Sequence, residues 1–173
     1  MRSDLLLRRK LTLRADSPVG SQKVVFVKKK QEGIEHVLMK AFLWGLYLPT
    51  YPEIAVEVPI GDRYKPDLVQ LDARGEPVFW GEAGKVSADK IASLLRRYPE
   101  THFAMAKWAT PLAPFVELVE EALDGRPRRA PFDLLRLPAD AGERFIADDG
   151  TITLGFDDVE RVRIGGDRAE QAV

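Results

Sequence analysis

Residues 65–85 read KPDLVQLDARGEPVFWGEAGK. This stretch contains two runs of residues that favour β-structure, 66–71 and 78–84. The runs are separated by a polar segment around Arg74-Gly75, which has the composition of a tight turn. We therefore expect an antiparallel pair of strands at the centre of the protein.

Each of these two strands carries an acidic residue at a position that alternates with apolar ones. Asp67 shares one face of its strand with Val69, and Glu82 shares one with Trp80. A carboxylate with apolar neighbours is costly unless it is neutralised, paired or bound to a cation. Both acids are therefore candidates for a functional site.

The register of the strand pair decides whether the two acids meet. If Asp72 pairs with Pro77 across a four-residue loop, 73–76, then Asp67 lies opposite Glu82. Directly opposed side chains have Cβ atoms about 4.5–5.5 Å apart, so the two charges would repel unless a divalent cation lay between them. A slip of one residue would put the acids on opposite faces. The metal interpretation depends on this register.

Composition limits the chemistry that is available. The chain has 173 residues, 45% of them hydrophobic and 31% charged, which suits one folded domain over residues 1–173. It has no cysteine, which excludes disulfides, thiol catalysis and Cys-ligated metals. Its two histidines are too few for a three-His zinc site. A metal site would therefore rest on carboxylates and favour Mg²⁺ or Mn²⁺.

Hydrophobic periodicity predicts the elements around the central strand pair. We expect an N-terminal β-hairpin over residues 1–30, a core over 33–109, a C-terminal helix with strands over 110–165, and a frayed tail over 166–173. The individual helices are expected over 33–48, 87–98 and 112–123, further strands over 53–60, 103–109 and 132–137, and a closing β-hairpin over 144–156. This order predicts an α/β (α+β) fold, with a mixed central sheet flanked by helices.

The charge is unevenly distributed along the chain. Residues 1–40 carry ten basic and four acidic side chains, whereas residues 140–173 carry four basic and nine acidic ones. The basic candidates for contact with nucleic-acid phosphates are Lys28, Lys29, Lys30, Arg128 and Arg129. The alternative is that the alternating charges of the first residues form the solvated face of a hairpin, and that the two arginines lie in a solvated loop.

Lys65-Pro66-Asp67-Leu68 followed by Trp80-Gly81-Glu82-Ala83-Gly84-Lys85 resembles the signature of the PD-(D/E)XK nuclease superfamily. That superfamily has a restriction-endonuclease-like αβββαβ core, and the elements expected over 33–109 follow the same order. Within the superfamily the chain is most similar to the YaeQ family. Members of that family open with a β-hairpin before the first helix and carry a Pro-Asp strand and a Trp-x-acid-x-Gly strand end.

The resemblance implies a site for Mg²⁺ or Mn²⁺. Asp67 and Glu82 would be metal ligands, and Glu35, in the first long helix, would complete the shell. The ion would activate water for attack on a phosphodiester. His36 and Glu57 are weaker candidates for the edge of this site.

The resemblance also implies a catalytic lysine two residues after the second acid, and the sequence departs from the pattern there. Gly84 occupies that position and the lysine follows at Lys85. A bulge or strand end at Gly84 would redirect Lys85 toward the site. Alternatively, Lys90 would take the role from the first turn of the next helix.

Two functions are consistent with these observations. One is a metal-dependent nuclease that acts on DNA or RNA. The other is a catalytically degenerate member of the fold that binds nucleic acid or protein. The first residues do not form a secretory signal, and the longest apolar stretch is too short to span a membrane, so we expect a cytoplasmic protein without a membrane partner.

Overall fold

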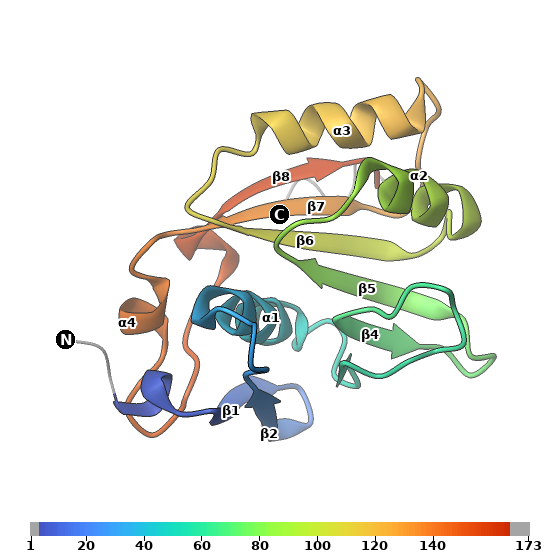
Figure 1. The fold of residues 1–173 in the computed structure, drawn as a ribbon. Helices are drawn as coiled ribbons and strands as arrows, with labels where there is room; N and C mark the ends of the chain where they lie inside the picture. The colour runs from blue at the N-terminus through green and yellow to red at the C-terminus, as the bar shows by residue number, and fades with distance from the viewer. Residues whose placement is uncertain (1–3, 167–173) are drawn as a thin grey trace.

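The computed structural model describes residues 4–166, and its centre is a six-stranded sheet with the order β3-β4-β5-β6-β7-β8 (Figure 1). The predicted tail lies outside these residues apart from Gly166. The strands of the sheet are β3 (Ala55–Val56), β4 (Leu68–Leu71), β5 (Pro77–Ala83), β6 (His102–Trp108), β7 (Phe132–Leu137) and β8 (Glu160–Ile164). β5, β6 and β7 are parallel to one another, and the remaining pairs are antiparallel. The expected mixed α/β sheet is confirmed.

Helices cover both faces of this sheet (Figure 1). One face packs on α1 (Ile34–Tyr47), which also carries the N-terminal hairpin of β1 (Lys10–Ser17) and β2 (Gly20–Val27). The other face is covered by α2 (Ala88–Arg97) and α3 (Ala113–Leu123), which pack against each other. The short elements are α4 (Ala141–Phe145) and the 3₁₀ helices η1 (Asp4–Leu7) and η2 (Phe156–Asp158). None of the helices among residues 4–166 is long and apolar enough to span a membrane.

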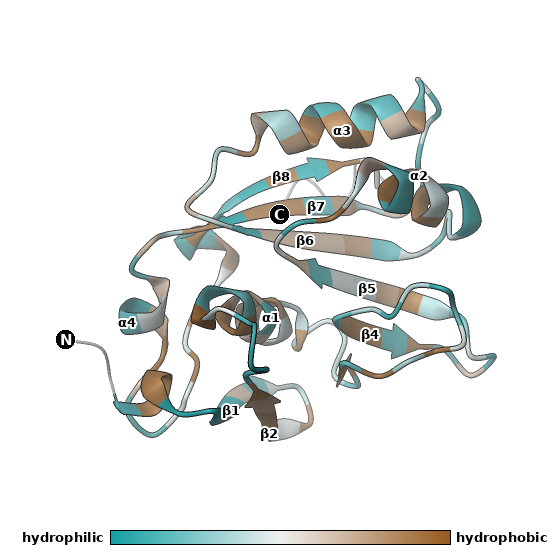
Figure 2. Cartoon of the chain, viewed as in Figure 1, coloured by the Kyte–Doolittle hydropathy of each residue, from teal (hydrophilic) through white to brown (hydrophobic). Residues whose placement is uncertain are grey.

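The hydrophobic core is divided by the sheet into two clusters. The α1 cluster contains the fully buried Trp44 and Phe42, and the α2–α3 cluster contains the fully buried Trp80. In Figure 2, α2 and α3 each carry both hydrophobic and hydrophilic residues, as expected for helices that cover one face of a sheet. The sheet therefore has one hydrophobic cluster on its α1 face and a second cluster on its α2–α3 face.

Local sequence signals explain where the helices begin and end. The hydroxyl of Ser87 accepts a hydrogen bond from the backbone N–H of Lys90, which caps the start of α2 as expected. Pro49 follows the end of α1, and α3 ends at Asp124, which adopts a left-handed conformation with φ of 50°. The start of α2 lies beside Glu82, because Lys90 in its first turn contacts that residue.

The register of the central strand pair agrees with the prediction, although the turn differs. Leu68 pairs with Gly81 and Val69 with Trp80, which places Asp67 and Glu82 at the same level. The loop is shorter than expected, because the backbone N–H of Asp72 bonds to the carbonyl of Glu76. A β-bulge next to Leu71 adds one residue to the second strand and restores the register.

Two predicted strand segments are shorter in the structure. The strand expected over 53–60 is limited to β3, because Glu57 has a left-handed φ of 55° and Pro59 has no N–H to donate. The closing hairpin over 144–156 turns at Asp148–Gly150 but has one antiparallel bridge, Ile146 with Ile152, and its first residues belong to α4. β8, for which the sequence indicated no element, is instead the last strand of the sheet.

Candidate functional site

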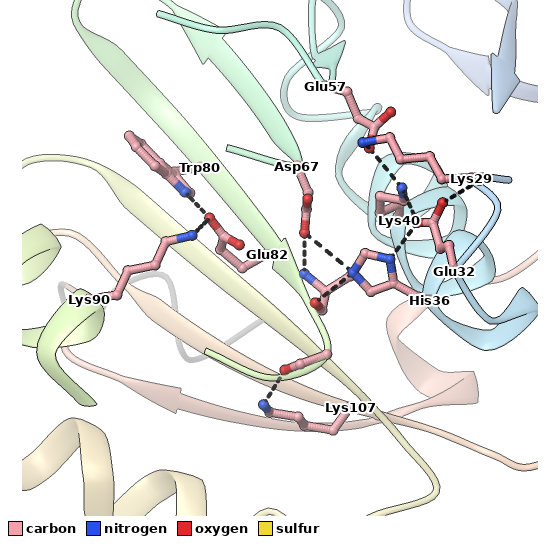
Figure 3. A network of polar contacts seen from close by, with 12 residues as sticks. Lys29, Glu32, His36, Lys40, Glu57, Asp67, Trp80, Glu82, Lys90 and Lys107 are labelled. Atoms are coloured by element: carbon pink, nitrogen blue, oxygen red, sulfur yellow. Dashed lines mark hydrogen bonds and ion pairs between the residues drawn. The ribbon is translucent and has the colours of Figure 1, made fainter. Parts of the chain in front are cut away.

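Asp67 and Glu82 come together at the carboxyl end of β5 (Figure 3). Asp67 directly precedes β4, and its Oδ2 atom accepts a hydrogen bond of 2.8 Å from the backbone N–H of Ala83. Glu82 is the residue before Ala83 on the neighbouring strand. We call Asp67 and Glu82 the carboxylate pair. Strand pairing, which the sequence predicts, is what brings it together.

Glu82 is an acid in an unfavourable setting. Its side chain is 8% exposed, and Oε1 accepts hydrogen bonds of 2.8 Å from Trp80 Nε1 and from the ammonium group of Lys90. Burial raises the pKa of Glu82, and the nearby charge of Asp67 raises it further, while Lys90 and Trp80 partly offset this. An additional positive charge between the two carboxylates would therefore be stabilised.

The two candidate lysines are placed differently. Lys90, from the first turn of α2, contacts Glu82 directly. Lys85 is exposed and forms no ion pair among the residues that the structure describes. Gly84 itself has a left-handed φ of 80°, and a Cβ atom there would lie 3.3 Å from the ring of His36. A side chain at position 84 is therefore disfavoured both by backbone conformation and by space.

His36 and Glu32 border the carboxylate pair on the α1 side (Figure 3). His36 Nδ1 lies 2.5 Å from Glu32 Oε1, and Nε2 lies 3.1 Å from the carbonyl oxygen of Ala83 and 4.0 Å from Asp67 Oδ2. Both ring nitrogens of His36 therefore lie within hydrogen-bonding distance of an oxygen atom. Glu32 was not among the predicted residues. Its spacing of four residues from His36 is the signal that could have identified it.

A chain of ion pairs extends from Glu32 to the molecular surface. The buried ammonium of Lys40 bonds to Glu32 at 2.6 Å and to Glu57 at 3.0 Å, and Lys29 lies 3.3 Å from Glu57. Burial on its own would raise the pKa of Glu32, but hydrogen bonds from the Lys29 backbone, Lys40 and His36 hold it at about 2. One open cleft gives Asp67 access to solvent, and it is also lined by Lys29, Glu32, His36 and Glu57. Glu82 is buried behind this cleft and does not line it.

Glu35, the third predicted metal ligand, lies elsewhere. It borders a small pocket with Leu6, Trp108 and Glu143, which is separate from the cleft that contains Asp67. The structure therefore does not bring Glu35 to the carboxylate pair. Throughout residues 4–166, no group of three or more His, Cys, Asp or Glu side chains is arranged to hold a metal ion. The three-acid shell that we expected is not formed.

Lys107 is a further charged residue near the site, and it was not among the predicted site residues. It lies on β6, is buried, and donates a hydrogen bond to the carbonyl oxygen of Gly84 (Figure 3). Its ammonium also lies 3.9 Å from the centre of the Phe115 ring. Burial lowers the pKa of Lys107 to about 8. A lysine is unusual within a strand of apolar residues, and this feature of the sequence could have identified Lys107.

The predicted phosphate-binding residues fall into two places. Of the three lysines that follow β2, Lys29 lines the cleft beside Asp67, Lys30 is exposed, and Lys28 is half-buried. Arg128 and Arg129 lie at another cleft, near the end of α2. Arg128 is not in a solvated loop, because it is 8% exposed and bonds to the carbonyl oxygens of Tyr98 and Thr101. The two basic segments thus do not form one surface patch around the site.

Comparisons with known proteins support the fold. The crystal structure of YaeQ protein from Pseudomonas syringae matches with a TM-score of 0.59 and 15% sequence identity, over 90% of this chain and 91% of that chain. The crystal structure of YaeQ protein from Xanthomonas axonopodis pv. citri matches with a TM-score of 0.54 and 14% identity, over 85% of this chain and 80% of that chain. No protein-family model and no curated protein matches the sequence. At these identities the comparison shows a YaeQ-like fold, and a shared fold does not establish a shared function.

Proposed function

We propose that the chain is a hydrolase of phosphodiester bonds in nucleic acid that depends on Mg²⁺ or Mn²⁺ and belongs to the PD-(D/E)XK type. The observation that carries this proposal is the placement of Asp67, Glu82 and Lys90 at one strand end. Asp67 lines an open cleft, Glu82 lies beside it on the neighbouring strand, and Lys90 contacts Glu82. Burial and the charge of Asp67 raise the pKa of Glu82 although Lys90 contacts it, and perturbed carboxylates of this kind are common at functional sites.

The oxygen atoms that remain free suit a hydrated hard cation. Glu82 Oε2 and Asp67 Oδ1 accept no hydrogen bond from residues 4–166, whereas the other oxygen of each carboxylate does. Mg²⁺ is commonly held by one or two carboxylates and keeps several of its waters. The residues therefore fit an ion bound by Asp67 and Glu82 alone, without a third acid. When bound, such an ion would lower the pKa of a coordinated water and stabilise negative charge on phosphate.

The residues of the chain would supply orientation and charge. Trp80 and Lys90 hold Oε1 of Glu82, so that Oε2 points away from them. The Ala83 N–H orients Asp67 in the same way. Lys90 would contact a phosphate oxygen next to Glu82, and Lys29 would add positive charge along the open cleft beside Asp67.

The proposal is tested by incubating the protein with plasmid DNA, single-stranded DNA and RNA in Mn²⁺ or Mg²⁺. We expect cleavage that needs the metal and is lost in Asp67→Asn and in Glu82→Gln. Glu35→Gln is the matched control, since it removes a nearby acid that lies outside the carboxylate pair, and it should retain activity. Cleavage that survives Asp67→Asn, or absence of cleavage on all three substrates, would contradict the proposal.

A second function, binding of nucleic acid without cleavage, is favoured by one observation. The ammonium of Lys90 already neutralises Glu82, and Gly84 leaves no side chain at the position of the superfamily lysine. In that case the protein would bind nucleic acid in a salt-dependent way through Lys28–Lys30 without hydrolysing it. Binding that is insensitive to charge reversal at these lysines would exclude this version.

A further inference from the structure

A second cleft lies at the opposite end of α2 from Lys90. It is formed by the end of α2, the end of α3 and the loop that leads into β7. Four arginines line it, Arg96, Arg126, Arg128 and Arg129, against a single acid, Glu100. In an α-helix the rise from Lys90 to Arg96 is about 9 Å, so this cleft is separate from the carboxylate pair.

The guanidinium of Arg128 is buried, and no carboxylate within residues 4–166 forms an ion pair with it. The residue is 8% exposed, its guanidinium donates to the backbone oxygens of Tyr98 and Thr101, and it lies 5.0 Å from the centre of the Phe103 ring. Its Nε atom is buried and has no hydrogen-bond partner in the part of the chain that the structure describes. Burial lowers the pKa of Arg128 to about 10, and the charge of Glu100 offsets this only in part. Buried charges in proteins are normally paired with an opposite charge.

The other three arginines of the cleft have N–H groups that form no hydrogen bond with residues 4–166. Arg96 is exposed and forms no ion pair with any residue in the described range 4–166. Arg129 is 84% exposed and makes one long contact of 3.4 Å with Glu100, which is itself exposed. Arg126 uses Nε and one terminal nitrogen to bond to the last carbonyls of α3, which fixes its position at the edge of the cleft.

We propose that this arginine cleft binds a phosphate group. An anion there would lie beside the buried guanidinium of Arg128, which has no ion pair within residues 4–166, and beside the remaining N–H groups of Arg96, Arg126 and Arg129. The planar forks of arginine match the oxygens of phosphate and form charge-assisted hydrogen bonds with them. This site goes beyond the proposed hydrolase function, since it needs neither the carboxylate pair nor a metal ion.

The test is titration of inorganic phosphate into the full chain in chloride buffer, followed by calorimetry. We expect saturable binding of one phosphate, weakened by about tenfold in the Arg96→Glu/Arg129→Glu double variant. Both side chains are exposed, so these changes should not prevent folding. Arg9→Glu, on the other side of the sheet, is the matched control and should bind as the wild type does.

A second variant tests the buried charge. Arg128→Gln should abolish saturable phosphate binding if it folds, which its circular dichroism spectrum reports; if it does not fold, the exposed double variant still decides. Equal binding by the wild type and the double variant, or no saturable binding by the wild type, would overturn the proposal.

The source of the phosphate is separated by competition. If a short oligonucleotide displaces phosphate from the Asp67→Asn protein, the cleft takes the backbone of nucleic acid. If it does not, the cleft takes free phosphate compounds. Because binding is measured without cleavage, failure of this site and failure of the hydrolase proposal give different results.

Discussion

Two regions of the molecule hold carboxylates in or beside the central sheet, and they are built differently. One is the carboxylate pair at the end of β5. The other is a set of residues near the start of β6 and β7, Tyr47, His102, Asp133 and Arg163, which we call the Asp133 network. Asp133 is fully buried, and its two oxygens accept bonds from Tyr47 at 2.6 Å, His102 at 2.8 Å and Arg163 at 2.8 and 3.0 Å.

The two regions differ in how burial and neighbouring charges shift the pKa of the acid at their centre. Burial alone would raise the pKa of Asp133, but His102 and Arg163 hold it well below its ordinary value. The pKa of Glu82 is instead raised, because burial and the charge of Asp67 outweigh Lys90 and Trp80. Asp133 has partners on both carboxylate oxygens, whereas Glu82 has partners on Oε1 alone, and its Oε2 accepts no hydrogen bond from residues 4–166.

The largest effect is expected from breaking the Asp133 network. Asp133→Ala would remove the carboxylate that half-buried Arg163 and buried His102 contact, and such losses cost about 3–5 kcal/mol of unfolding free energy. Urea denaturation measures this. A loss below about 1 kcal/mol would show that the network is not a structural centre.

At the carboxylate pair we expect a substitution to reduce activity without reducing stability. Asp67→Asn should reduce phosphodiester cleavage by about 100-fold or more, which corresponds to about 2.7 kcal/mol of transition-state stabilisation. Its unfolding free energy should stay equal or rise, because a like charge next to Glu82 is removed. Parallel loss of stability and activity in Asp67→Asn would remove the distinction between the two regions.

The contribution of Glu32 to the unfolding free energy is expected to depend on pH. Its pKa of about 2 lies below the ordinary 4.5, so its ionised form stabilises the folded state above that value and the contribution disappears as the pH falls toward 2. We expect Glu32→Gln to lose about 2 kcal/mol at pH 7 and little at pH 2. Glu35→Gln is the control, and an equal loss for both variants at pH 7 would contradict the assignment.

The smallest effect is expected from Lys90→Met. Without the ammonium, ionised Glu82 loses a partner, and we expect a cost of about 1 kcal/mol. Because a protonated Glu82 needs no counter-charge, the cost should grow as the pH rises above the raised pKa of this acid. Thermal unfolding at pH 5 and pH 8 measures the trend, and a cost that shrinks with pH would contradict it.

Much of the fold could be predicted because it depends on local patterns. Alternation identified the central strands, Ser87 marked the start of α2, and the two acids stood out against their apolar neighbours. The register was predicted correctly although the loop was not, because the bulge next to Leu71 compensates for the shorter loop. Such compensation is not visible in sequence.

The parts that were missed depend on contacts between distant segments. Glu35 and Glu32 both lie near the start of α1, and only the packing of α1 on the sheet determines which of them faces Asp67. Lys90 and Lys85 differ through the left-handed turn at Gly84. Asp133 and β8 are joined by Arg163, about thirty residues away in the chain, and no periodicity predicts that pairing.

We expect Asp67 and Glu82 to form a cation site without Glu35. Titration of Mn²⁺ into the wild type, Glu35→Gln and Asp67→Asn, with the bound ions counted by electron paramagnetic resonance, measures this. We predict one site in the wild type and in Glu35→Gln, and none in Asp67→Asn. Equal binding by Asp67→Asn and the wild type, or loss of the site in Glu35→Gln, would contradict the account.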